Sequence, residues 1–354
     1  MGSRQLLKPA LSLEKPTLFT ICNENLKTLS IITSRNITMN NTITYLTTSE
    51  IDHDKALLLI DASIQAYNAF NKDNPTKCDS GNVKHPKGYE LVGSWTGVDA
   101  VFNEVKKIEC YGVVFRTKQA PYTYIFAFRG TDGIEDLVDD FGFDHTPFIA
   151  YKNDAVIPSD VAVESGFYHI YSDSDSDTTS MQEQAFALID QYQASEQPIH
   201  QLYITGHSLG CTLSTLFTLD LALSRPDIKV SNYNYASPRV GNQAFVNFYE
   251  QQPPQQDPET RTVRIQNVYD KVPCTPLEDQ GYQHLPYAYL IAFYRDNLTG
   301  KFDIVDNHFF GNYQTTLECA FSSATGLCEK VFEYDQNKKM KSVEPDSASI
   351  CKYW

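Results

Sequence analysis

The 354-residue sequence contains no apolar run that approaches the roughly 18 residues of a membrane-spanning helix. Basic residues are also scarce, since 29 Lys and Arg face 44 Asp and Glu and leave a net charge of −15. Nucleic acid and anionic lipid both attract basic surfaces, so this balance argues against non-specific nucleic-acid binding and against electrostatic docking on anionic membranes. The net charge does not argue against binding to a neutral lipid surface.

The start of the chain has no apolar segment of the kind found in a cleavable signal peptide. This predicts either a cytoplasmic protein or export by a route other than the Sec pathway.

Metal-binding motifs are absent as well. The eight cysteines are widely spaced and include no Cys-x-x-Cys. The acidic run at 172–177 resembles the start of a calcium loop, but Thr178 and Gln184 stand where that loop needs Gly and Glu. We therefore expect no metal and no cofactor. Cys319 and Cys328 bracket a short loop and could form a disulfide, although free thiols explain them equally well.

The remaining composition, 42% apolar and 21% charged, is that of an ordinary globular protein. Residues 1–50 are rich in Thr, Asn and Ile without a helical period, which predicts an N-terminal extension, either a short hairpin or a loosely attached segment. We expect one domain over 51–354.

Strand and helix patterns alternate through that domain. Helices are predicted at 52–70, with Asp52 as N-cap, and at 181–192, 209–224 and 242–252, and strands at 111–117, 122–130, 199–208, 230–237 and 261–267. The alternation predicts an α/β fold with a mostly parallel central sheet flanked by helices.

The strongest motif is Gly206-His207-Ser208-Leu209-Gly210, which lies between an apolar strand and an apolar helix. In this context Gly-x-Ser-x-Gly is typical of a nucleophile elbow, a sharp turn that exposes a serine hydroxyl above the sheet. The two glycines provide room where a Cβ would clash, and the helix directs backbone N–H groups at a developing oxyanion. We expect the side chain of His207 to point into the packing beside the sheet.

A nucleophilic serine needs an acid and a base, which follow it in the order Asp or Glu, then His. Asp270 comes directly after the predicted strand 261–267. Two histidines follow it: His308 lies where a possible strand, 301–305, gives way to a helix, and His284 lies in an aromatic stretch typical of a structural imidazole. The loop context favours His308.

Five segments together resemble the class 3 lipases, the fungal-type lipases with an α/β-hydrolase fold: FAFRGTD (126–132), VESGFYHIY (163–171), GHSLG (206–210), YASPRVGN (235–242) and NVYDKVPCTP (267–276). The resemblance implies Ser208 as nucleophile, Asp270 as orienting acid, His308 as base and a structural role for His284. It also implies that Thr131 and Leu209 form the oxyanion hole.

The activity implied is hydrolysis of lipid carboxylic esters, with acylglycerols first and a lipid–water interface as the setting. Phospholipase A1 activity, hydrolysis of small or aryl esters, and a non-catalytic binding role on the same scaffold are the alternatives. Residues 132–163 correspond to the lid region of the family and mix five large apolar residues with aspartates. Either an amphipathic flap or an ordinary surface loop is consistent with that pattern.

Overall fold

The computed structural model describes residues 42–99, 107–131, 133, 144–152, 154–295, 303–328, 331–335, 338–342, 346–347 and 350–351. None of the helices among them is long and apolar enough to span a membrane.

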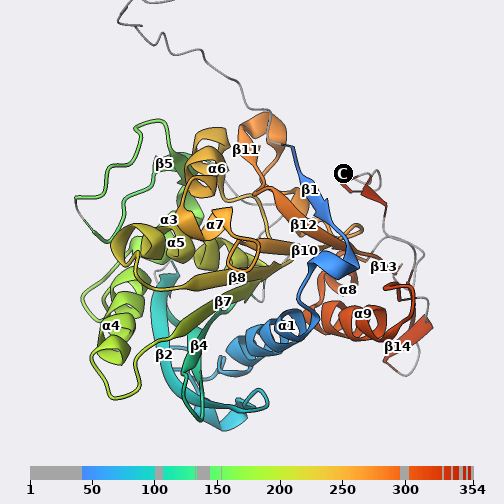
Figure 1. The fold of residues 1–354 in the computed structure, drawn as a ribbon, viewed down its shortest axis with the longest axis horizontal. Helices are drawn as coiled ribbons and strands as arrows, with labels where there is room; N and C mark the ends of the chain where they lie inside the picture. Colours follow the sequence, from blue (N-terminus) through green and yellow to red (C-terminus); the bar gives the residue numbers. More distant parts are fainter. Residues whose placement is uncertain are drawn as a thin grey trace, which may run out of the picture. The chain divides into compact units, whose positions relative to one another are not determined.

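The centre of the described chain is a sheet of eight strands (Figure 1). Their spatial order is β1 (Thr44–Leu46), β12 (Tyr287–Ile291), β10 (Val263–Asn267), β8 (Val230–Tyr235), β7 (Gln201–His207), β4 (Thr123–Phe128), β3 (Lys107–Thr117) and β2 (Tyr89–Asp99). Pairing is parallel from β1 to β4, and β3 and β2 add antiparallel strands at one edge. This is the mostly parallel sheet of an α/β-hydrolase fold, as predicted.

Helices cover both faces of the sheet (Figure 1). They are α1 (His53–Asn68), α3 (Ser165–Ser172), α4 (Met181–Gln193), α5 (Leu209–Ser224), α6 (Gln243–Glu250), α7 (Pro253–Gln256), α8 (Ile304–His308) and α9 (Phe310–Ser322). Smaller strands form two further sheets: β5 (His145–Pro147), β6 (Ala162–Glu164), β9 (Gly241–Asn242) and β11 (Tyr282–Gln283), and then β13 (Phe293–Tyr294), β14 (Val331–Asp335) and β15 (Lys338–Ser342).

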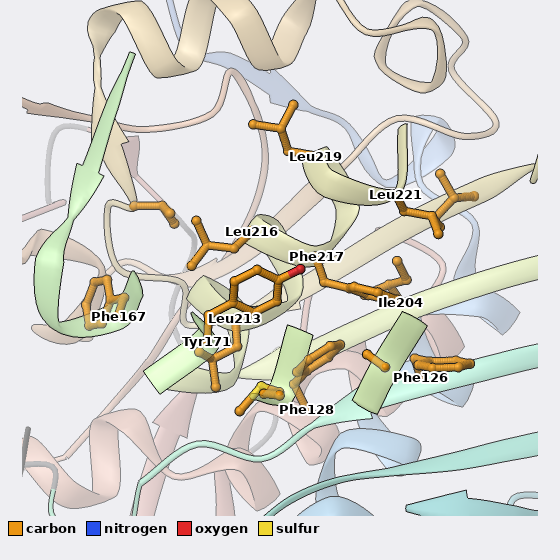
Figure 2. Close-up of a cluster of buried hydrophobic side chains, with 14 of the residues drawn as sticks. Phe126, Phe128, Phe167, Tyr171, Ile204, Leu213, Leu216, Phe217, Leu219 and Leu221 are labelled. Carbon is orange, nitrogen blue, oxygen red and sulfur yellow. The ribbon is translucent and has the colours of Figure 1, made fainter. Parts of the chain in front are cut away.

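Strand β4 shows how the sequence creates two cores. Tyr124, Phe126 and Phe128 alternate with Ile125 and Ala127, and all five are fully buried. Because successive strand side chains point to opposite faces, the three aromatic residues pack with α3, α4 and α5, and the other two pack with α1 and α9. Figure 2 shows Phe126 and Phe128 beside Phe217 of α5. Burial on both faces explains the nearly continuous apolar sequence of this strand.

Most predicted elements are present. Helix α1 starts where expected, with the Asp52 carboxylate accepting from the Lys55 N–H at 3.0 Å. The strand predicted at 301–305 is wrong for its described part. Asp303 caps α8 by accepting from Asp306 N–H, so a helix begins there instead.

The sequence analysis missed three strands of the central sheet. Strand β2 escaped because its pairing with β3 shifts register twice, at 91–93 and 95–96, which breaks the two-residue alternation. The short strands β1 and β12 pair with each other at the opposite edge. Residues 44–46 therefore belong to the central sheet, and the predicted boundary at residue 50 falls too late. Residues 1–41 lie outside the described part.

Three disulfides join Cys78 to Cys110, Cys274 to Cys351, and Cys319 to Cys328. The third is the bridge suggested by the sequence, and the other two were not predicted. Cys211 is a buried free thiol beneath the Gly206–Gly210 turn.

Candidate active site

Ser208 lies in the sharp turn between β7 and α5. Its backbone has φ 59° and ψ −132°, a left-handed conformation that costs free energy for a residue with a side chain. The Ser208 N–H donates to the Tyr235 carbonyl at 3.0 Å, which fixes the turn against β8. The side chain is fully buried, and its Oγ has no hydrogen-bond partner among the described residues.

The glycines of this turn are required by close backbone contacts. A Cβ on Gly206 would lie 2.2 Å from the Gly210 carbonyl oxygen, and one on Gly210 would lie 2.3 Å from the carbonyl oxygen of Phe128. The end of β4 is equally tight, because a Cβ on Gly130 would lie 2.6 Å from the carbonyl oxygen of His207. The backbone that leads to Thr131 therefore packs closely against the Ser208 turn.

Asp270 and His308 meet behind this turn. His308 Nδ1 lies 2.8 Å from Asp270 Oδ2, and both side chains are fully buried. Since the carboxylate accepts, Nδ1 carries the proton and Nε2 is left as the basic nitrogen. His308 Nε2, like Ser208 Oγ, has no partner among the described residues.

Two further donors hold the Asp270 carboxylate. The Tyr313 hydroxyl donates to Oδ2 at 2.7 Å, and the Val272 N–H donates to Oδ1 at 2.9 Å. Burial and the neighbouring Asp270 charge raise the pKa of Tyr313 well above its usual value, so its hydroxyl keeps its proton. The carboxylate is therefore held in one orientation.

The loops that carry Asp270 and His308 are joined by two asparagines. Asn267 Nδ2 donates to the Asn307 carbonyl at 2.9 Å, directly before His308. Asn307 in turn donates to the carbonyls of Arg295 and Asp303. Both asparagines are fully buried, so these bonds are shielded from water and fix the separation of the two loops.

His207 connects the serine turn to His308. Burial, and then the nearby His308, lower its pKa well below the usual value, so it is neutral. Its Nε2 lies 2.9 Å from the His308 carbonyl oxygen and must donate there, which leaves Nδ1 to accept from the Tyr67 hydroxyl at 3.1 Å. As expected, the ring points into the interior.

Thr131 and Leu209 are the predicted oxyanion-hole residues. Leu209 is the first residue of α5, where backbone N–H groups have no acceptor within the helix. Thr131 follows Gly130, and its Oγ1 accepts from the Gly133 N–H at 3.1 Å, which leaves the hydroxyl proton available to a ligand. Arg129 anchors this loop through Glu109 at 2.6 Å and through the Phe70 ring.

His284 lies apart from this cluster. Its Nε2 lies 2.7 Å from the carbonyl oxygen of Pro273, and burial followed by two nearby arginines lowers its pKa well below the usual value. This is the structural role expected for it.

Part of the predicted lid region can be described. Phe148 is buried, Ile149 is 63% exposed, and Tyr151 stacks on Phe186 with ring centroids 4.2 Å apart. The described residues of this region contain β5 and β6 and no helix before α3. Phe141, Phe143 and the aspartates 139 and 140 lie outside the described residues, so the flap and the surface loop both stay predictions.

The sequence analysis missed the side chains that support the acid and the base. Tyr313, Asn267, Asn307 and Tyr67 come from three separate segments. Their roles depend on tertiary contacts. For Asn267, Asn307 and Tyr313 the only sequence signal was closeness to the motifs, three residues before Asp270, one before His308 and five after it, and Tyr67 had no such signal.

A strained serine between strand and helix, with a buried Asp–His pair behind it, defines the chain as a serine hydrolase of the α/β-hydrolase fold. The family described as Lipase (class 3) matches residues 125–280. Over these residues the chain is similar to the class 3 lipases, and this similarity supports a lipase-type carboxylic ester hydrolase.

Three relatives give the range of this similarity. A secreted mono- and diacylglycerol lipase A of Penicillium cyclopium is 28% identical over 245 residues, 68% of this chain and 70% of that protein. Phospholipase A1-IIalpha of Arabidopsis thaliana is 31% identical over 171 residues, 43% of this chain and 38% of that protein. A Yarrowia lipolytica lipase structure, 20% identical, aligns over 71% of this chain and 82% of its own with a TM-score of 0.52. That structure supports the fold alone.

Proposed function

We propose that this protein hydrolyses acylglycerol esters through an acyl-enzyme on Ser208, with His308 as base and Asp270 as orienting acid. The observation that carries the proposal is the 2.8 Å contact of His308 Nδ1 with Asp270, together with the unpartnered buried Oγ and Nε2 atoms of Ser208 and His308. Unpartnered buried polar atoms are costly to a fold, so their presence here suits a site that completes its bonds only with substrate.

In this mechanism His308 Nε2 takes the Ser208 proton as Oγ attacks the ester carbonyl. Asp270 keeps the other proton on Nδ1 and stabilises the imidazolium that forms. His308 then protonates the departing alcohol, and water repeats the sequence to release the acid. The N–H groups of Thr131 and Leu209 stabilise the tetrahedral oxyanion, each contributing roughly 10²–10³ in rate.

The test is hydrolysis of short- and long-chain nitrophenyl esters by the native chain, Ser208→Ala and His308→Ala. We expect activity to vanish in both variants. Ser231→Ala, which removes another buried serine hydroxyl, and the exposed His200→Ala serve as matched controls and should retain activity. Activity that survives Ser208→Ala would overturn the mechanism, and a folded native chain inactive on all esters and lipid emulsions would favour a binding role.

For the substrate we propose neutral mono- and diacylglycerols first. The Penicillium relative is named for these lipids, and a net charge of −15 favours neutral over anionic surfaces. Phospholipase A1 activity is the second candidate because of the Arabidopsis relative. Fatty-acid release from diacylglycerol emulsions and from phosphatidylcholine vesicles, measured side by side, distinguishes the two.

We also propose that the protein is exported. Three disulfides suit an oxidising compartment, and the Penicillium relative is named as secreted. Alkylation of the protein from its native source before reduction should leave the six bridged cysteines unlabelled. Labelling of all eight would contradict export.

A further inference from the structure

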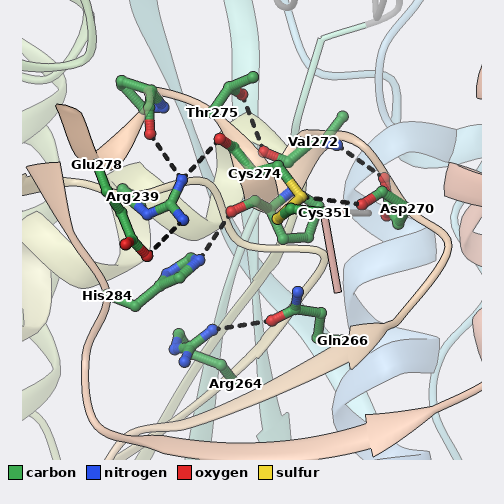
Figure 3. The surroundings of a disulfide bond; sticks show 12 residues. Arg239, Arg264, Gln266, Asp270, Val272, Cys274, Thr275, Glu278, His284 and Cys351 are labelled. Atoms are coloured by element: carbon green, nitrogen blue, oxygen red, sulfur yellow. Dashed lines mark hydrogen bonds and ion pairs between the residues drawn. A yellow bond between two sulfur atoms is a disulfide. The ribbon is translucent and has the colours of Figure 1, made fainter. Parts of the chain in front are cut away.

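A cavity of about 570 Å³ lies behind the loop that follows Asp270. Its wall includes the Cys274–Cys351 disulfide, and its polar side chains include Arg239, Arg264, Gln266 and His284. Figure 3 shows Arg239 between Cys274 and Glu278, with His284, Arg264 and Gln266 below the segment that runs from Asp270 to Glu278. The cavity is separate from the Ser208 site, because no residue of the proposed triad or oxyanion hole lines it.

Arg264 places an uncompensated positive charge at this cavity. The side chain is 3% exposed, and no carboxylate of the described residues forms an ion pair with it. Its Nε donates to the Leu285 carbonyl at 2.8 Å, and Nη1 donates to Gln266 Oε1 at 3.1 Å. Burial, and then the charge of Arg239, lower the pKa of Arg264 to about 9. Since arginine stays protonated in proteins, the guanidinium is a buried cation in need of an anion.

Gln266 supplies a second donor beside it. The side chain is 3% exposed, and its Nε2 has no partner among the described residues, while its Oε1 is held by Arg264. A buried amide donor next to a guanidinium fits an oxygen ligand that can accept from both.

The other charges of the cavity are arranged differently. Arg239 donates to the carbonyls of Cys274 and Pro276 and pairs with Glu278 at 2.9 Å, so its charge is already compensated. Asp279 lies exposed at the rim. The positive end of the cavity is therefore at Arg264, and the rim is acidic.

The mouth of the cavity is partly apolar. Ile43, Tyr45, Leu277 and Ile350 line it, and Tyr45 and Leu277 are 43% and 44% exposed. A small inorganic anion would leave this apolar surface without a partner, whereas an alkyl chain would cover it.

We propose that this cavity binds an aliphatic carboxylate, with the carboxylate accepting from Arg264 and Gln266 and the alkyl chain lying against the apolar mouth. Binding itself does not depend on the proposed function. One consequence does: an aliphatic carboxylate is the class of product that the proposed reaction releases. Because Arg239 and His284 hold the 273–276 loop from inside this cavity, an occupant acts on the segment that follows Asp270.

The experiment measures octanoate binding to the full-length chain by calorimetry and by the shift in Tm. The background is Ser208→Ala, so that failure of the hydrolase mechanism cannot affect the result. We expect a saturable rise in Tm of about 3 °C or more with octanoate, and little or none with octanol or inorganic phosphate.

Variants locate the site. Gln266→Glu supplies an internal carboxylate to Arg264, so it should raise the Tm of the ligand-free protein and abolish the Tm shift caused by octanoate. The control, Gln251→Glu, adds the same charge at an exposed position and should have neither effect.

Arg264→Lys should weaken octanoate binding about tenfold or more, because lysine keeps the positive charge but lacks the planar, two-pronged N–H donors of the guanidinium. Asp279→Asn should strengthen binding about twofold by removing a rim carboxylate.

Three results would overturn the proposal. They are the absence of octanoate binding, octanoate binding that Gln266→Glu and Arg264→Lys leave unchanged, and phosphate binding at least as tight as that of octanoate.

Discussion

The two halves of the active site are built in different ways. The serine half is a turn defined by backbone contacts within a few residues, where Gly206 and Gly210 leave no room for a Cβ. The acid–base half depends on side chains from separate elements, with Tyr313 of α9 and Asn267 of β10 fixing Asp270 and His308. His207 bonds the two halves together. Local geometry thus positions the proposed nucleophile, and long-range hydrogen bonds position its proposed activators.

Apart from loss of Ser208 or His308 themselves, the largest effect on turnover is expected for Asp270→Asn. The amide would present an N–H group to His308 Nδ1 and force the wrong tautomer, so kcat should fall about 10⁴-fold. The fold should survive, because the side-chain oxygen can still accept from Val272. Steady-state kinetics with circular dichroism as a fold control tests this. A loss of less than tenfold would mean that Asp270 is not the orienting acid.

Gly206→Ala should break the serine half through the fold. The added methyl would lie 2.2 Å from a backbone carbonyl oxygen that cannot move without moving α5. Overpacking of this kind costs about 1–3 kcal/mol or more. Urea unfolding is the measurement, and Gly81→Ala, whose Cβ meets only the Asp79 side chain at 3.1 Å, is the matched control. Equal stability of the two variants would argue against a sterically closed turn.

Tyr313→Phe should weaken the acid–base half without breaking it. Asp270 would lose the donor at 2.7 Å but keep Val272, so we expect kcat to fall about tenfold with KM unchanged, a loss on the scale of one hydrogen bond to a charged group. Tyr249→Phe removes another buried tyrosine hydroxyl, bonded to Thr262, and should change stability alone. If both variants kept full kcat, the Tyr313 bond would be structural only.

The smallest effect on turnover is expected from Glu164, which caps α3 away from both halves by accepting from the Gly166 and Phe167 N–H groups. Burial raises its pKa from 4.5 to about 7. Between these two values the folded state binds more protons than the unfolded state, so the free energy of unfolding should fall as pH rises, by up to about 1.4 kcal/mol per pH unit.

Glu164→Gln should flatten that decline between pH 4.5 and 7 and leave kcat nearly unchanged. The exposed Glu196→Gln is the control. Urea unfolding at several pH values gives the slopes, and an unaltered slope in Glu164→Gln would assign the pH dependence to other groups.

The same contrast explains what could be predicted from the sequence. The serine turn and helix α5 were predicted because their signals lie within a few adjacent residues, and α5 begins and ends at the predicted positions. Tyr313 and Asn307 were missed because an isolated Tyr or Asn carries no pattern. Strand β2 was missed because its register shifts hide the alternation. Arg264 was read only as part of a strand, since nothing local marks a buried arginine that lacks a carboxylate partner.

The central claim is that Ser208 is the nucleophile activated by His308 and Asp270, and covalent trapping tests it most directly. A nitrophenyl alkylphosphonate, which mimics the tetrahedral intermediate, should release one nitrophenol per chain and add one phosphonyl group on the peptide containing Ser208. Labelling should be lost in Ser208→Ala and strongly slowed in Asp270→Asn. Equal labelling of the native chain and Ser208→Ala, or a phosphonyl group mapped to another residue, would contradict the account.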